Sequence, residues 1–98
     1  RAAWRALVAS RGRVPVGALA AELGWSRRHL AARFRGDVGA SPKFLARLLR
    51  FEHAAERIRA GAQPLGDVAL ACGYYDQAHL NREVREFTGA APGALRAA

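Results

Sequence analysis

The chain has 98 residues and a formal net charge of +8, and 51% of its residues are hydrophobic. This length suits one compact unit or two very small ones, and the hydrophobic fraction excludes a disordered tail. No apolar run approaches the roughly 18 residues that span a membrane, and no signal peptide is visible, so we expect no membrane partner. The one cysteine cannot form an internal disulfide, which fits a reducing compartment such as the cytoplasm. Because the chain begins with arginine instead of methionine, we expect it to be a segment of a larger protein.

The positive charge is concentrated in the first half of the chain. Residues 1–50 hold eleven basic and two acidic side chains, a net of +9, whereas residues 51–98 hold five basic and six acidic side chains, a net of −1. Fifteen of the sixteen basic residues are arginine, whose guanidinium suits phosphates and guanine edges. A basic surface indicates a polyanion, most often nucleic acid. The alternative is a solvated charge that reflects only an arginine-rich and alanine-rich composition.

Two short helices are predicted first, from apolar residues at helical spacing. One would cover the core of the first half, and its apolar residues are Trp4, Leu7 and Val8. The other has a buried face at the i, i+3, i+4, i+7 spacing, formed by Val16, Leu19, Ala20 and Leu23. Gly24 ends this second helix, because a left-handed turn residue costs least at glycine.

A third helix follows the glycine turn. Ser26 is the N-cap residue that starts it, Leu30 and Phe34 face inward, and Gly39 closes it. Helix, short glycine turn and helix together form the helix-turn-helix pattern. Ala20, four residues before the turn glycine, lets the two helices cross closely.

Residues 41–61 predict one linker helix of about 20 residues, on the order of 30 Å long. Ser41 caps it, Pro42 takes the favoured first helical position, and Gly61 closes it. Its apolar stripe is formed by Phe44, Leu48, Phe51, Ala55 and Ile58. A rod of this length would hold two DNA-reading units at a fixed separation, close to the 34 Å or so of one B-DNA turn.

The second half of the chain repeats the first. PVGALAAELG (15–24) aligns with PLGDVALACG (64–73) at an offset of 49. SRRHLAARFRGDVGASPKFL (26–45) aligns with DQAHLNREVREFTGAAPGAL (76–95) at an offset of 50, with seven identities in twenty positions. The second copy therefore has one extra residue just after its turn glycine. Its predicted buried residues are Leu65, Val68, Ala69, Cys72, Leu80, Val84 and Phe87, with Asp76 as the N-cap, Gly89 as the helix end and Pro92 opening a last helix.

The repeat predicts an all-α fold of about seven helices. Two helix-turn-helix, homeodomain-like subdomains would be joined by the long linker helix. We assign residues 1–40 to the first subdomain, 41–61 to the linker helix and 62–98 to the second subdomain.

Cys72, Asp76 and His79 are residue types that bind metals or act as nucleophiles, and they lie close together in the sequence. The first copy keeps the same frame with Leu23 and Ser26 at the matching positions, so the frame does not need that chemistry. Cys72 is expected to pack in the core, Asp76 to cap a helix, and His79 to be packed or hydrogen-bonded. The chain also has no four-ligand zinc pattern, no phosphate-binding glycine loop and no nucleophile elbow. We therefore expect no enzyme activity, no catalytic residue, no metal and no cofactor.

The stretch DVALACGYYDQAHLNREVREFTGAAPGALR (67–96) resembles the signature of the AraC/XylS family of bacterial transcription regulators. The matching positions are Ala69, Cys72, Gly73, Tyr74, Asp76, Gln77, His79, Arg82, Gly89 and Pro92. Upstream, LAAELGWSRRHLAARF (19–34) is similar to the first helix-turn-helix of the family. The resemblance implies a seven-helix DNA-binding domain, with RNA polymerase as a partner of the full-length protein. It also implies a separate effector-sensing or dimerisation domain outside this chain, so that the isolated domain is a monomer and the full-length protein a dimer.

The outward faces of the two recognition helices are expected to meet DNA. In the first copy these positions are Arg27, Arg28, Ala31, Ala32 and Arg35; in the second they are Gln77, Ala78, Asn81, Arg82 and Arg85. Arg28 and Arg82 suit guanine, Asn81 and Gln77 suit adenine, and the two alanines of the first copy suit thymine methyl groups. Arg27, Arg33, Arg35 and Arg85 are expected at phosphates. For each arginine, the alternative is a solvated surface charge.

Together these features predict sequence-specific binding of double-stranded DNA by two recognition helices that enter successive major grooves. The alternative is a basic helical module that binds another protein. RNA binding is disfavoured because no exposed aromatic stacking platform is predicted.

Overall fold

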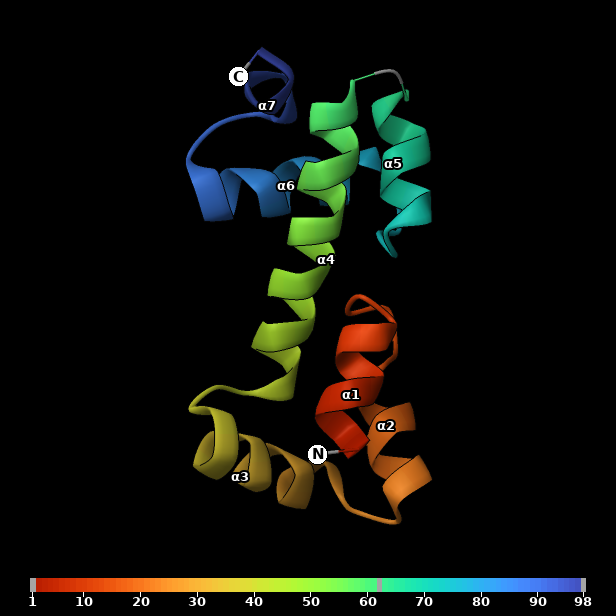
Figure 1. The fold of residues 1–98 in the computed structure, drawn as a ribbon, viewed down its shortest axis with the longest axis vertical. Coiled ribbons are helices and arrows are strands. Elements are labelled where there is room, and N and C mark those ends of the chain that lie inside the picture. Colours follow the sequence, from red (N-terminus) through yellow and green to blue (C-terminus); the bar gives the residue numbers. More distant parts are fainter. Residues whose placement is uncertain (1, 62, 98) are drawn as a thin grey trace. The chain divides into compact units, whose positions relative to one another are not determined.

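The computed structural model describes residues 2–61 and 63–97. Within these ranges the chain is all-α, with seven helices and no strand (Figure 1). The helices are α1 (Ala2–Ala9), α2 (Val16–Leu23), α3 (Arg27–Val38), α4 (Pro42–Ala60), α5 (Leu65–Ala71), α6 (Gln77–Thr88) and α7 (Pro92–Ala97). They form two compact units, Arg1–Leu49 and Arg50–Ala98, and the division falls inside α4. The predicted fold class and helix number are confirmed.

The first unit buries one apolar cluster between α1, α2, α3 and the first part of α4. Its buried members are Ala3, Leu7, Leu19, Ala20, Leu30, Phe34, Leu45 and Ala46. On α1 the prediction was wrong for two residues, since Trp4 is 36% and Val8 42% exposed. The inward face is formed by Ala3 and Leu7 instead, which precede Trp4 and Val8 by one residue each. The helix is therefore rotated about its axis by about 100° from the predicted orientation.

The second unit has its own apolar cluster. Its buried members are Ala54, Ile58, Val68, Ala69, Cys72, Tyr74, Leu80 and Val84. Phe87 is half-buried, and its ring stacks on Phe51 with 4.9 Å between the centroids. Cys72 is fully buried, which confirms its predicted place in the core.

The predicted linker helix is present as α4. The Ser41 hydroxyl accepts a hydrogen bond from the Phe44 backbone N–H at 3.1 Å, and Gly61 follows the helix with φ +96°. The predicted apolar stripe was partly wrong, because Phe44 is 45% exposed while Leu45 and Ala46 are buried. Each compact unit takes its own residues from α4, so one continuous stripe does not describe the buried positions.

The two glycine turns have the predicted local geometry. Gly24 and Gly73 have φ of +70° and +92°, a region that glycine adopts without strain. After the first turn, the Trp25 backbone N–H donates to the Ala20 carbonyl at 2.9 Å. After the second, Tyr74 makes the equivalent bond to Ala69, also at 2.9 Å. Tyr74 therefore corresponds to Trp25, and the extra residue of the second copy is Tyr75.

Candidate nucleic-acid interface

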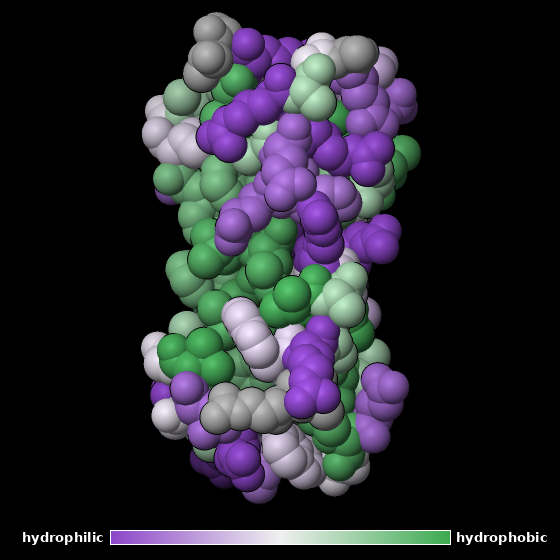
Figure 2. Space-filling model, in the orientation of Figure 1, coloured by the Kyte–Doolittle hydropathy of each residue, from purple (hydrophilic) through white to green (hydrophobic). Residues whose placement is uncertain are grey.

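Helix α3 presents most of the predicted first-copy residues to solvent. The Ser26 hydroxyl caps the helix by accepting a hydrogen bond from the His29 backbone N–H at 3.0 Å, and buried Leu30 and Phe34 fix which side faces inward. Of the predicted residues, the exposed ones are Arg27, Arg28, Ala32 and Arg35, while Ala31 is half-buried. Figure 2 shows hydrophilic side chains over α3, at the lower end of the view. The structure thus brings these side chains onto one accessible helix face, and their contact with DNA stays a prediction.

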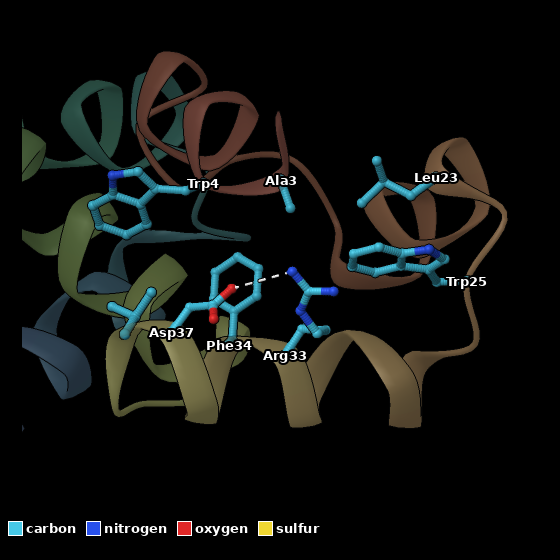
Figure 3. Close-up of a pocket in the computed structure, with 8 residues that line it drawn as sticks. Ala3, Trp4, Leu23, Trp25, Arg33, Phe34 and Asp37 are labelled. Atoms are coloured by element: carbon cyan, nitrogen blue, oxygen red, sulfur yellow. Dashed lines mark ion pairs between the residues drawn. The ribbon is translucent and has the colours of Figure 1, made fainter. Parts of the chain in front are cut away.

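Arg33 differs from the other arginines of α3, because it is engaged within its own unit. Its guanidinium lies over the Trp25 ring, 5.5 Å from the centroid, and 3.6 Å from the Asp37 carboxylate (Figure 3). The Trp25 ring in turn lies 4.5 Å from the ring of His29. Trp25, in the glycine turn, thus contacts both Arg33 and His29 of α3, with its ring tilted against that of His29. These contacts make Arg33 less available to a phosphate than predicted.

Helix α6 repeats this arrangement in the second unit. The Asp76 carboxylate caps it by accepting a hydrogen bond from the His79 backbone N–H at 2.8 Å. The exposed predicted residues are Gln77, Ala78, Arg82 and Arg85. Asn81 is half-buried, like its counterpart Ala31, and its Oδ1 atom is buried without a hydrogen-bond partner in the described part of the chain. Asn81 is therefore less open to a base edge than the prediction implied.

A buried ionic network fixes α6, and the sequence prediction missed it. Glu83 on α6 is only 3% exposed. Arg50 on α4 donates to both of its carboxylate oxygens, from Nε at 3.2 Å and from Nη2 at 2.9 Å. The Tyr74 hydroxyl donates to the same carboxylate at 3.1 Å. The missed signal was spacing, because Glu83 falls on the inward stripe with Leu80, Val84 and Phe87.

The rings beside this network pack closely around it. The Arg50 guanidinium lies 5.0 Å from the Tyr74 ring centroid, and Tyr74 meets His79 edge-on with 5.0 Å between centroids. His79 Nδ1 accepts the Tyr75 backbone N–H at 3.3 Å, and its Nε2 lies 3.9 Å from Glu83. Burial, with the negative charge of Glu83, raises the pKa of Tyr74 well above its usual value. His79 is therefore packed and hydrogen-bonded within the turn, as predicted.

The two units differ in charge as well as in internal contacts. Residues 1–49 contain ten basic and two acidic side chains, a net of +8, and residues 50–98 contain six of each, a net of zero. One basic and one acidic side chain of the second unit, Arg50 and Glu83, neutralise each other in its interior. The electrostatic attraction for a polyanion therefore resides in the first unit.

A pocket of about 240 Å³ lies in the first unit (Figure 3). Its lining residues are Ala3, Trp4, Leu23, Trp25, Arg33, Phe34, Asp37 and Val38. None of the five residues predicted to face DNA on α3 is among them. Arg33, which was predicted to contact a phosphate, does line the pocket.

Among residues 2–61 and 63–97, no three His, Cys, Asp or Glu side chains are grouped so that they could hold a metal ion. None of the helices described is both long and apolar enough to cross a membrane.

Two capped helices that each follow a glycine turn and expose a polar face define the chain as a tandem helix-turn-helix domain. A family model described as a helix-turn-helix domain matches residues 19–98. The chain belongs to this family, and relatives described as AraC-like or AraC-family regulators identify its type.

Similar proteins come from both curated sequences and solved structures. The probable bifunctional transcriptional activator/DNA repair enzyme AlkA of Mycobacterium tuberculosis is 40% identical over 82 residues, which are 84% of this chain and 16% of that protein. The HTH-type transcriptional activator RhaR of Pectobacterium atrosepticum is 35% identical over 72 residues, 74% of this chain and 25% of that protein. The DNA-binding domain of AdpA, a global transcriptional factor solved in complex with a target DNA, is 30% identical with a TM-score of 0.83. That match covers 98% of this chain and 86% of the AdpA chain. This chain therefore spans only a small part of each curated relative.

Proposed function

We propose that this chain is the sequence-specific, double-stranded DNA-binding domain of a bacterial transcription regulator. The observation that carries the proposal is the repeated exposure of a capped recognition helix, with Leu30 or Leu80 buried on its inner side. The likeness to a domain solved on its target DNA supports it. In this proposal α3 and α6 enter successive major grooves, about 34 Å apart along B-DNA. Residues 1–40 and 62–98 act as the two reading subdomains, and residues 41–61 link them.

The exposed side chains have distinct roles in this proposal. Arg28 reads a guanine edge from the first turn of α3, and such a contact is worth roughly 1–3 kcal/mol of discrimination. Arg82 does the same from α6, and Asn81 and Gln77 serve an adenine. Arg27, Arg35 and Arg85 contact phosphates, and the alanines let the helix backbone approach the bases.

The difference in charge predicts which recognition helix matters more. Because residues 1–49 carry a net charge of +8 and residues 50–98 carry none, the first unit should supply most of the affinity. Arg28→Ala should then weaken binding and relax its sequence preference more than Arg82→Ala does. Equilibrium binding of both variants to the same duplex checks this order, and a larger loss for Arg82→Ala would refute it.

The decisive experiment is selection of bound duplexes from a random pool, followed by a salt titration on the selected site. We expect one preferred sequence, or two half-sites about one turn apart, and affinity that falls steeply as salt is raised. Negligible affinity for every duplex at about 50 mM salt would overturn the proposal and favour a protein-binding module.

For the full-length protein we propose a cytoplasmic transcription regulator that contacts RNA polymerase and dimerises through a domain outside this chain. The isolated domain is a monomer without catalytic activity in this proposal. Light scattering of the purified domain tests whether it is a monomer. A dimer formed by this chain alone would contradict it.

A further inference from the structure

Gly17, in the first turn of α2, lies against the guanidinium of Arg27. A Cβ atom built on Gly17 would overlap the Arg27 guanidinium, with Cζ and Nε each only 3.1 Å away. Beyond its chain neighbours and the backbone of α2, the three nearest atoms to that Cβ all belong to Arg27. Gly17 has no positive φ, so the backbone conformation does not require glycine. The space that Gly17 leaves is therefore occupied by one side chain, the first residue of the recognition helix.

The second copy has the same juxtaposition in a looser form. Gly66 on α5 corresponds to Gly17 in the repeat, and Gln77 corresponds to Arg27. A Cβ on Gly66 would meet only Gln77 Oε1, at 3.8 Å, which is ordinary van der Waals contact. A methyl group would therefore displace the Arg27 guanidinium in the first copy and would displace nothing in the second.

We infer that Gly17 is a positioning residue for DNA binding, because it lets the Arg27 guanidinium lie against the first turn of α2. The inference rests on the proposed function, in which Arg27 contacts a phosphate. A long arginine side chain that is already held near its bound position loses less conformational freedom on binding. A methyl group at position 17 would displace the guanidinium and remove this advantage without removing the charge.

Gly17→Ala separates this role from a purely structural one. Alanine is a better helix former than glycine, and the atoms it would displace are the end of a flexible side chain. The variant should therefore fold with a melting temperature that is unchanged or a few degrees higher. A residue that served only the fold would not show equal or higher stability together with weaker binding.

The test compares wild type, Gly17→Ala, Arg27→Ala, the double variant and the matched control Gly66→Ala on one selected duplex. Arg27→Ala should weaken binding about five-fold and lower the salt slope by about 0.9, as expected for one lost phosphate contact. Gly17→Ala should show at least half of that loss on a logarithmic scale. The double variant should bind like Arg27→Ala, because both changes remove the same contact. Gly66→Ala should bind like wild type.

Three results would overturn the inference: unchanged binding by Gly17→Ala, additive losses in the double variant, or an equal loss in Gly66→Ala. Absence of DNA binding by the wild-type chain would instead refute the proposed function. In that case the free protein still tests the positioning. The Arg27 Nε–Hε NMR signal should move in Gly17→Ala and stay in place in Gly66→Ala, and an unmoved signal in both variants would show that Gly17 does not place Arg27.

Discussion

Removing the Glu83 carboxylate should destabilise the second unit more than any surface change. Glu83→Ala takes away the acceptor of three hydrogen bonds, two from Arg50 and one from Tyr74. The Glu83 side chain is 4% exposed and that of Arg50 15%, so the arginine charge would remain largely buried without its partner. Breaking such a pair costs about 3–5 kcal/mol.

This loss is a large part of the free energy of unfolding of a small domain. Small domains are stable by about 5–15 kcal/mol, so Glu83→Ala should remove roughly a fifth or more of the free energy of unfolding. At roughly 4–8 °C per kcal/mol, the melting temperature should fall by at least about 12 °C. The buried Tyr74 hydroxyl, left without its acceptor, adds to the loss.

The aromatic residues let the assay report on each unit separately. Both tryptophans lie in residues 1–49 and both tyrosines in residues 50–98. Urea unfolding followed by tyrosine absorbance therefore reports the second unit, and tryptophan fluorescence reports the first. The loss caused by Glu83→Ala must be seen in the tyrosine signal.

Two further variants distinguish a lost pair from a lost side chain. Glu52→Ala removes an exposed glutamate from α4 and should leave the tyrosine transition where it is. Arg50→Met with Glu83→Leu replaces both charges by apolar side chains and should recover most of the stability, because no charge is left buried alone. The reasoning fails if Glu83→Ala unfolds like Glu52→Ala, or if the double variant is no more stable than Glu83→Ala.

Two other predictions concern the turns. The raised pKa of Tyr74 means that the folded state keeps a proton that the unfolded chain releases above about pH 10, so stability from this group is complete below pH 10 and declines as pH rises above it. At pH 11 the free energy of unfolding should be lower by about 1.4 kcal/mol. This loss should vanish in Tyr74→Phe and persist in Tyr75→Phe, which changes a 90% exposed ring. If the free energy of unfolding fell equally with alkaline pH in the wild type and both variants, the prediction would be contradicted. Ser26→Ala should cost about 1 kcal/mol of stability by removing the α3 cap. Ser26→Asp should keep the wild-type stability, because aspartate caps α6 in the same way at Asp76. Equal melting temperatures for the two variants would contradict the role of the cap.

Local features of this fold were predictable because their causes lie within a few residues. The glycine turns, the caps Ser26 and Asp76, and the starts of α4 and α7 follow from backbone conformation and short-range hydrogen bonds. The repeat strengthened each of these predictions, since the same pattern occurs twice. The structure confirms the helices and the burial of Leu19, Leu30 and Leu80, whereas Leu23, Leu48 and Leu65 are only partly buried. The residues that contact DNA remain predictions.

The errors arose where distant segments decide which side chain is buried. Trp4 and Phe44 are larger and more apolar than Ala3 and Ala46, so a hydrophobicity pattern favours them for the core. The structure buries the smaller residues instead, because they lie on the helix faces that contribute to the apolar cluster of the first unit. Glu83 was missed for a related reason: its partner Arg50 lies 33 residues away, and no local pattern pairs them.

One position explains much of how the two copies have diverged. Arg33 and Glu83 occupy the same place in the repeat, and each contacts the aromatic residue that follows its turn glycine. Arg33 lies over the Trp25 ring and stays 55% exposed. In the first unit the residue after the turn glycine thus packs against an arginine whose charge stays at the surface. Glu83 accepts the Tyr74 hydroxyl and takes Arg50 into the interior. The second unit thus fixes its recognition helix by a buried ion pair that adds no net charge. If the chain binds DNA as proposed, the first unit should therefore supply most of the electrostatic attraction, and the second should depend more on the side chains that α6 exposes.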